Sequence, residues 1–367
     1  MLKRYVNLPV DFTLLTFIIA LLASFLNKPS ISSKVLNVLL WIIPFSIFYL
    51  ITMVYSPSNT YSLLKAGKLL MSILSLFIVT IIFSKKNSFI YFRAIFKIVY
   101  VALVTILTFL FVTGQFSTFF ITGDLLLAPD YLSISTFLAT SLFLYLKDRG
   151  FFINTVKILS LLAILLLGGR GPFVITVILL LIYFAKMLIR GSFIRNLIIY
   201  FIVIAGLFIL SVELSLHERT FERLASLIED PTDSYLNPRY PMWVFAWESF
   251  LEKPIFGHGL GSFGLYYLNV DMRAYPHNLI LEILFEAGVI GLILAIIFGG
   301  RVSKYLKINN IALELKLILF FFLLDFMKSN SIEDLRVFLI WIGIILMSNI
   351  STEECVNHTA KEKLESI

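Results

Sequence analysis

Four side chains beside apolar stretches have the chemistry to bind an anion and to take up a proton. Arg170 lies in a G-G-R-G-P turn between two apolar runs, and Arg239 begins the segment R-Y-P-M-W. His277 and Asn278 close a Y-P-H-N segment that leads into a further apolar run. Two guanidinium groups suit a diphosphate, because each can donate paired N–H groups to phosphate oxygens. An imidazole accepts protons near neutral pH, so His277 is a candidate base for an attacking hydroxyl.

Each of these residues also has a structural interpretation. Arg170 can reach lipid headgroups from a tight helix hairpin. Asn278 is a natural N-cap, with His277 as a second capping residue. Glu286 lies one helical turn after Glu282 in the apolar run, where carboxylates are costly. We expect both carboxylates to face the protein interior and to have a partner there.

A glycine-rich segment, 254–264, precedes the Y-P-H-N segment. It matches G-x-G-x-x-G at Gly259, Gly261 and Gly264, but no strand comes before it and no βαβ unit surrounds it. A dinucleotide site is therefore excluded. The segment instead predicts a flexible or tightly turned loop that contains His258.

The composition places these residues in a membrane protein. The chain has 367 residues, of which 59% are hydrophobic and only 14% are Asp, Glu, Lys or Arg. Soluble domains typically carry about 25% of such charged residues. The net charge of +7 lies in short clusters between apolar runs, which excludes nucleic acid and indicates membrane lipid as the surroundings. Cys355 is the only cysteine, and no CxxC or HExxH motif occurs, so neither a metal site nor a cofactor is expected.

Eleven apolar stretches are candidate membrane spans, because a span needs roughly 20 apolar residues. They are 10–26, 35–55, 69–83, 95–113, 131–146, 154–169, 172–189, 194–212, 279–298, 311–327 and 335–350. Lipid offers no hydrogen-bond partner to an open backbone, so every span should be helical. The predicted fold is all-α, a polytopic transmembrane helical bundle of about 10–12 spans. We expect it to form a single membrane domain over 1–367.

The basic residues set the predicted orientation. They form clusters two spans apart, at 85–97, 147–157, 186–195 and 301–307. The positive-inside rule makes that side cytoplasmic, so 213–278 faces outward as a large extracytoplasmic loop that carries part of the site. Lys328 and Arg336 lie in the last outer loop and are candidate supporting residues, as are Asn278 and Glu286. Eleven spans leave the N-terminus outside, against the rule, unless a further span or a re-entrant segment lies in the first third.

Together these motifs resemble the O-antigen ligase and polymerase superfamily. The resemblance is strongest from Arg239 to Gly291, where R-Y-P-M-W, K-P-I-F-G-H-G-L-G-S-F and Y-P-H-N-L-I-L-E-I-L-F-E-A-G-V-I-G-L follow in the family's order. The G-G-R-G segment is similar to the family's outer S-R-G turn, with Gly169 where Ser is usual. The resemblance implies a metal-independent, inverting transfer of a glycan from undecaprenyl diphosphate. It implies that Arg170 and Arg239 hold the diphosphate and that His277 is the base or orients the acceptor hydroxyl.

The resemblance leaves two activities open. A polymerase joins lipid-linked oligosaccharide repeat units of O-antigen or capsular polysaccharide, whereas a ligase transfers the glycan to lipid A–core. We prefer the polymerase, because the chain is short and its outer loop is modest. The implied partners are the undecaprenyl-diphosphate-linked donor, the glycan acceptor, membrane lipid and a chain-length regulator. The implied location is the bacterial inner membrane, with the site facing the periplasm or the cell exterior.

A polysaccharide or lipid transporter is the alternative from a different class. Transporters tend to contain paired repeats and broken helices near the middle of the bilayer. No internal repeat is visible in this sequence, and its polar residues gather in an outer loop.

Overall fold

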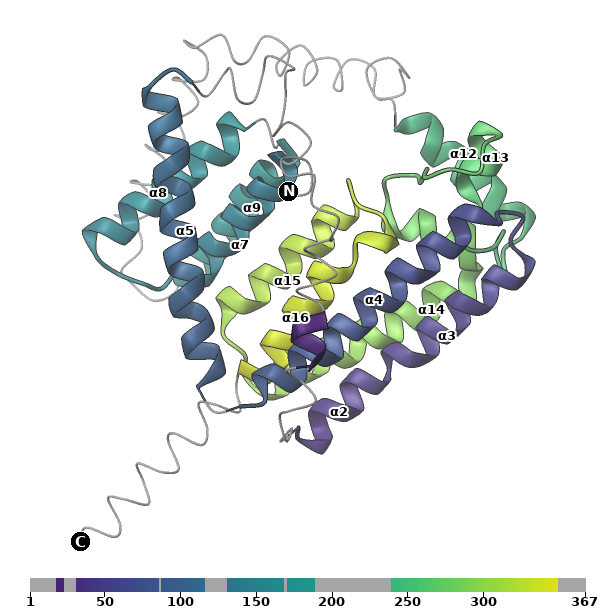
Figure 1. Ribbon diagram of the computed structural model, residues 1–367, viewed down its shortest axis with the longest axis horizontal. Coiled ribbons are helices and arrows are strands. Elements are labelled where there is room, and N and C mark those ends of the chain that lie inside the picture. The colour runs from purple at the N-terminus through teal and green to yellow at the C-terminus, as the bar shows by residue number, and fades with distance from the viewer. Residues whose placement is uncertain are drawn as a thin grey trace, which may run out of the picture. The chain divides into compact units, whose positions relative to one another are not determined.

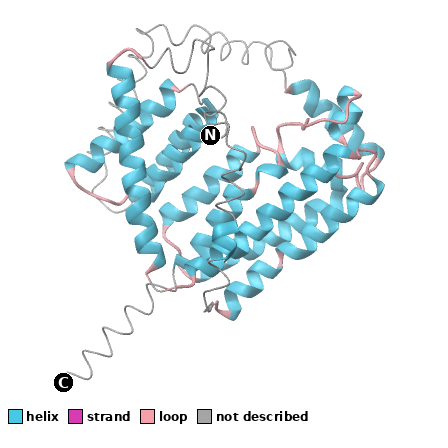
Figure 2. Cartoon of the chain, in the orientation of Figure 1, coloured by secondary structure: helices cyan, strands magenta, loops and turns pink. Residues whose placement is uncertain are grey.

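The computed structural model describes residues 18–22, 31–85, 87–115, 131–167, 170–188 and 239–348. Over these ranges the chain consists of helices and loops, without a strand (Figure 2). The predicted all-α membrane fold is confirmed, because four of the described helices are long and apolar enough to cross a membrane. They are Ser33–Tyr55, Thr60–Phe83, Ser88–Val112 and Leu279–Ile308.

The chain divides into two compact units, each built from segments far apart in sequence. The first comprises Met1–Pro9, Arg93–Asn237 and Ala312–Asp325, and the second comprises Val10–Phe92, Pro238–Ile311 and Phe326–Ile367. Whether the two units behave as the single membrane domain expected from the sequence stays a prediction.

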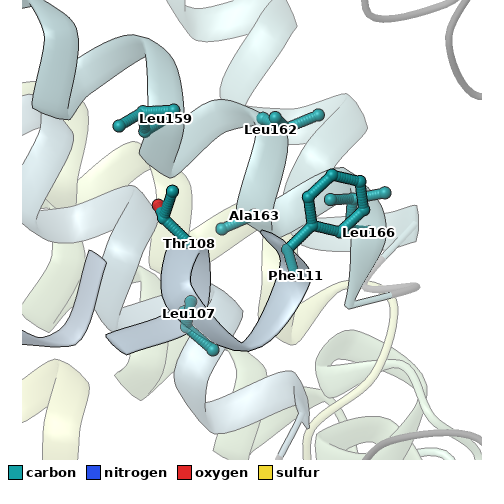
Figure 3. Close-up of a pocket in the computed structure, with 7 residues that line it drawn as sticks. All are labelled: Leu107, Thr108, Phe111, Leu159, Leu162, Ala163 and Leu166. Carbon is teal, nitrogen blue, oxygen red and sulfur yellow. The ribbon is translucent and has the colours of Figure 1, made fainter. Parts of the chain in front are cut away.

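The first unit contains most of α5 (Ser88–Val112), together with α7 (Tyr131–Leu144), α8 (Phe151–Leu166), α9 (Arg170–Leu188) and α15 (Leu313–Phe326). Helices α7, α8 and α9 pack against one another. A cavity of about 20 Å³ lies between α5 and α8, as Figure 3 shows, with Leu107, Phe111 and Leu162 among its lining residues. Its one polar side chain, Thr108, donates its hydroxyl to the carbonyl of Val104 in its own helix. The cavity is therefore apolar and holds no polar group for a ligand.

In the described part of the second unit, the helical residues 18–22 are followed by nine helical elements (Figure 1). They are α2 (Ser33–Leu40), α3 (Ile42–Ile51), η2 (Thr52–Tyr55), α4 (Thr60–Phe83), α12 (Tyr240–Glu252), α13 (Phe263–Leu268), α14 (Leu279–Ile308), η4 (Ile332–Asp334) and α16 (Arg336–Ser348). Helix α4 packs along α16, and α14 packs on α3 and α12. Gly343 allows the close approach of α16 to α4, since a Cβ there would lie 3.1 Å from Thr80 Oγ1.

Nine of the eleven predicted spans coincide with described helices, whereas 194–212 and all of 10–26 except 18–22 lie outside the described residues. Helix α14 continues to Ile308, ten residues beyond the predicted end of 279–298. The largest difference at a helix start concerns 69–83, because α4 begins nine residues earlier, at Thr60. The predicted boundary avoided Lys65 and Lys68, which are unfavourable in lipid. In the fold both lysines form ion pairs with carboxylates, so the helix can include them.

Candidate active site

Three segments predicted to face outward meet at one end of the second unit: 56–59, 253–278 and 327–335. Asp271 connects the first two. Its carboxylate accepts hydrogen bonds from Ser58 Oγ at 2.6 Å and from the backbone N–H of Thr60 at 2.8 Å. The backbone N–H groups of Asn59 and Tyr61 also donate to it, at 3.1 and 3.3 Å. Asp271 thus caps the N-terminus of α4 from a distant part of the chain.

The pKa of Asp271 reflects this cap. Burial alone would raise the pKa, but the hydrogen bonds from Ser58 and from the first backbone N–H groups of α4 lower it below its ordinary value. The carboxylate is therefore ionised near neutral pH, which also favours its place beside a helix N-terminus.

Arg273 connects the long loop to the segment before α16. Its guanidinium forms ion pairs with Glu333 and with Asp334, the latter at 3.0 Å. Glu333 also accepts from Lys68 Nζ at 3.0 Å and from the hydroxyl of Tyr61 at 3.2 Å. Ion pairs of Arg273 and Lys68 with Glu333 thus connect segment 253–278 and the start of α4 to segment 327–335.

A buried ion triad lies below these loops, in the helices. Lys65 Nζ is 2.5 Å from Glu282 Oε1 and 2.7 Å from Glu286 Oε1, and all three side chains are 0% exposed. The expectation that both glutamates face the interior and have a partner is confirmed. The three charges sum to −1, so the carboxylates need further donors.

Four polar groups from three other segments satisfy the two carboxylates. Glu286 accepts from Tyr49 Oη at 2.9 Å and from the backbone N–H of Gly261 at 2.9 Å. Glu282 accepts from Ser331 Oγ at 2.5 Å and from the backbone N–H of Ile332 at 3.0 Å. The triad therefore connects α3, α4 and α14 to both the glycine-rich segment and the segment before η4.

Helix α14 is interrupted at Gly288, whose φ of 62° and ψ of −163° are not helical. The glycine-rich segment supplies the missing backbone partners. The N–H groups of His258 and Gly259 donate to the carbonyls of Phe285 and Glu286, at 2.7 and 2.9 Å. In return, the N–H of Val289 donates to the carbonyl of Pro254 at 2.9 Å, and the N–H of Ile290 to that of Ile255 at 3.4 Å. A break in an apolar helix is tolerated because each freed backbone group finds a protein partner.

The glycine-rich segment is tightly turned, which is one of the two loop forms expected from the sequence. Gly257, Gly259 and Gly261 have positive φ values of 72°, 96° and 73°. A Cβ on Gly257 would lie 2.5 Å from the carbonyl carbon of Glu286, so only glycine allows this approach to α14.

His258 belongs to the core of this arrangement. Its ring is 1% exposed, lies 4.8 Å from the ring of Phe285, and has Nε2 2.7 Å from the carbonyl oxygen of Ser249. Burial lowers the pKa of His258, and the hydrogen bond to Ser249 opposes that effect only in part. His258 is therefore a neutral core residue that anchors the segment on α12 and α14.

His277 lies at the start of α14 in an uncommon conformation. Its φ of 54° is in the left-handed region, which few residues other than glycine adopt. Its Nδ1 is 3.3 Å from the carbonyl oxygen of Ser329, and its ring lies 4.3 Å from that of Tyr275. The preceding residue, Pro276, accepts a hydrogen bond from Trp243 Nε1 at 2.8 Å. Contacts on both sides thus maintain a backbone conformation that a histidine alone disfavours.

Arg239 lies in the same part of the unit as His277. Burial lowers the pKa of His277, the hydrogen bond to Ser329 opposes this, and the positive charge of Arg239 lowers it further. Arg239 precedes α12 and is half-buried, and its guanidinium forms no ion pair with any described residue. A guanidinium with no ion pair among the described residues can bind an anionic ligand, and an imidazole whose pKa is lowered is neutral near pH 7 and can accept a proton.

The remaining candidate residues have different positions. Asn278 caps α14, as predicted, with Oδ1 accepting from the N–H groups of Ile280 and Leu281 at 3.1 Å each. Lys328 is half-buried beside Ser329, and Arg336 is the half-buried first residue of α16. Arg170 is the first residue of α9, in the first unit, whereas His277 belongs to the second unit. The 213–238 part of the outer loop lies outside the described residues.

The described residues contain no group of three or more His, Cys, Asp and Glu side chains that could hold a metal ion. Lys65 was not among the predicted site residues, because it lies between the predicted spans 35–55 and 69–83. A signal was available, because Tyr61, Lys65 and Lys68 continue the helical spacing of the following apolar run at i, i+4 and i+7.

Two comparisons bear on this site. The sequence model of the family described as O-antigen ligase matches residues 155–296, which include Arg170, Arg239, His277 and Glu286. A protein of Rickettsia conorii, named provisionally as a polysaccharide ligase, is 30% identical over 224 residues, which are 52% of this chain. The chain spans about half of that relative's length, 54%. Both findings confirm the resemblance to the O-antigen ligase and polymerase superfamily.

Proposed function

We propose that this multi-pass membrane protein is a glycosyltransferase whose donor is a glycan linked to undecaprenyl diphosphate. The observation that carries the proposal is the position of His277 at the start of α14, half-buried and with Nδ1 3.3 Å from the carbonyl oxygen of Ser329, within the residues that match the family. The acceptor hydroxyl oxygen attacks the anomeric carbon as its proton passes to His277. The bond from that carbon to the phosphate oxygen breaks, and undecaprenyl diphosphate leaves with the electron pair.

The proposed step inverts the anomeric carbon, because attack and departure take place on opposite faces in a single displacement. Negative charge develops on the departing diphosphate, so Arg239 and Arg170 would act mainly in the transition state. The proposal needs no metal, since two guanidinium groups replace the cation that usually accompanies a diphosphate.

The choice of acceptor decides between ligase and polymerase. The family description and the name of the Rickettsia protein both refer to a ligase, and this favours transfer to a separate acceptor such as lipid A–core. The polymerase preferred from the sequence uses the same donor, with a second lipid-linked repeat unit as acceptor. Mass analysis of the products separates the two, because only a polymerase extends glycans that stay on undecaprenyl diphosphate.

We propose that the site opens to the outer side of the bacterial inner membrane. The three segments that meet around Asp271 and Arg273 all belong to loops that the positive-inside rule places outside. A reporter fused after Asn269 should be active only outside the cytoplasm. Activity of a cytoplasmic reporter at that position would overturn this orientation.

His277→Asn tests the catalytic role most directly. Removing a general base should slow transfer by roughly 10²–10⁴-fold. The fold should persist, because Asn is both a good cap and the non-glycine residue most tolerant of the left-handed region. The assay is transfer from purified lipid-linked donor in vesicles, with donor binding measured in parallel. Near-normal glycan from a folded variant would refute the catalytic assignment.

The control for this substitution must use the same two residue types in the same backbone conformation. Asn269 is exposed and has a φ of 56°, close to that of His277. Asn269→His should therefore change stability only slightly and leave transfer unaffected. His258→Asn is unsuitable as a control, because it would open a gap against Phe285 in the core.

A further inference from the structure

The hydrogen bond of His277 fixes which ring nitrogen carries the proton. A backbone carbonyl can only accept, so the 3.3 Å contact with Ser329 requires a hydrogen on Nδ1. In the neutral ring, Nε2 then keeps its lone pair. Nε2 makes no hydrogen bond within the part of the chain that the structure describes, and the ring is half-buried. The unoccupied nitrogen is therefore the basic one.

The Ser329 carbonyl also accepts from Tyr275 Oη at 3.4 Å, and the segment that carries it is held from inside the protein. Two residues further on, Ser331 donates its hydroxyl to Glu282 Oε1 at 2.5 Å, and the next backbone N–H, of Ile332, donates to Oε2 at 3.0 Å. Glu282 is fully buried and is itself bound by Lys65 Nζ at 2.5 Å. A continuous series of polar contacts thus runs from α4 through α14 to the segment that contacts His277.

We propose that Glu282 is a positioning residue for His277: by holding segment 329–332 it keeps the Ser329 carbonyl on Nδ1 and leaves Nε2 as the proton acceptor. The inference rests on the proposed function, in which His277 is the base. Orientation of an imidazole through a hydrogen bond at its second nitrogen is a general device in acid–base catalysis. In this protein a backbone carbonyl provides that bond, and a carboxylate from the next helix fixes the carbonyl.

The substitution Glu282→Gln tests the idea because the three partners of Glu282 place opposing demands on an amide. With its oxygen in the Oε1 position, the amide satisfies Lys65 and Ser331, but its NH₂ then faces the N–H of Ile332. Turned over, it places NH₂ against the ammonium of Lys65. In either orientation the amide NH₂ therefore faces another hydrogen-bond donor. We expect segment 331–332 to shift in response. Lys65 keeps its pair with Glu286, so the substitution leaves no unpaired buried charge.

The experiment measures the tautomer of His277 by ¹⁵N solid-state NMR on histidine-labelled full-length protein in lipid bilayers at pH 8. The chain has four histidines, and the His277 signals are assigned by their loss in His277→Asn. In the unsubstituted protein we expect a protonated Nδ1 and an unprotonated Nε2. In Glu282→Gln we expect a population with the proton on Nε2 and about fivefold lower kcat at unchanged KM for the donor, since one neutral hydrogen bond shifts such a population by about two- to tenfold.

Two further variants separate positioning from a general loss of structure. Glu286→Gln removes the neighbouring carboxylate of the same triad but leaves both hydrogen bonds to segment 331–332, so the His277 tautomer should not change. Ser331→Ala keeps all three buried charges and removes only one of those hydrogen bonds, so it should shift the tautomer in the same direction as Glu282→Gln.

The outcomes distinguish this inference from the proposed function. A proton on Nε2 in the unsubstituted protein, or the same tautomer in Glu282→Gln as in the parent, overturns the positioning role. An equal shift in Glu286→Gln also overturns it, because the effect would then follow from loss of either carboxylate. Normal transfer by His277→Asn refutes the catalytic role alone, since the NMR result needs no activity.

Discussion

Lys65→Met should be among the most destabilising single substitutions in the second unit. The change removes three hydrogen bonds, of 2.5, 2.7 and 2.8 Å, between one ammonium and two carboxylates. Met fills a similar volume, so the effect is electrostatic and no large cavity is left. Two buried carboxylates would then lie in the apolar interior without a counter-charge.

The magnitude follows from what remains around the two carboxylates. Removing one partner of a buried ion pair typically costs about 3–5 kcal/mol. Four other hydrogen bonds to Glu282 and Glu286 persist, so we expect the lower part of that range, about 3–4 kcal/mol. For a unit of this size, that corresponds to a melting temperature lower by about 6–16 °C.

The assay is thermal unfolding of the purified protein in detergent, followed by intrinsic fluorescence. The informative comparison is Lys65→Met combined with Glu282→Gln and Glu286→Gln, in which no buried charge remains. Without Lys65, each amide can accept from a backbone N–H and donate to a hydroxyl, of Ser331 or Tyr49, so the triple variant should regain most of the lost stability. A triple variant less stable than Lys65→Met would refute the electrostatic reasoning.

Gly288→Ala should destabilise by about 2 kcal/mol or more, because its φ is positive and its Cβ would collide with the carbonyl of Ile255. The control Gly299→Ala, in the same helix with open space around it, should stabilise by about 0.5–1 kcal/mol, both read from thermal unfolding. His258, whose pKa burial lowers, takes up its proton more readily when unfolded. Unfolding free energy should therefore fall as pH falls below about 6.5, and His258→Gln should flatten that dependence. Arg239→Lys and Arg170→Lys keep the charge but lose the paired donors, so transfer should fall strongly at normal membrane levels; normal glycan from both would remove their diphosphate role.

Hydrophobic length and charge placement predicted the helices well, because lipid imposes both on the sequence. The boundary of α4 was wrong for the same reason. A rule that treats lysine as excluded from lipid fails where the lysine is paired, and the partners of Lys65 lie more than 200 residues away. Such a pairing is tertiary information, and a single sequence does not contain it as a local pattern.

The sequence predicted those features of the site that depend on residues close together in the chain. Asn278 as a cap and the glycine-rich turn follow from residue types over a few positions. The hydrogen bond between His277 and Ser329, and the cap of α4 by Asp271, join loops from different parts of the sequence, so no spacing rule reveals them. His258 was predicted only as a loop residue, and no local pattern indicated its burial, which arises because the glycines allow that loop to pack tightly on α14.

The exchange of backbone hydrogen bonds between segment 254–259 and the interrupted α14 constrains how this sequence can vary in length. Four bonds set the register of one segment against the other. Inserting or deleting a single residue between Ile255 and His258 would put the two bonds at one end of the segment out of register with the two at the other end. Related chains should therefore carry their insertions elsewhere in the outer loop and keep this segment at constant length, even where its side chains differ.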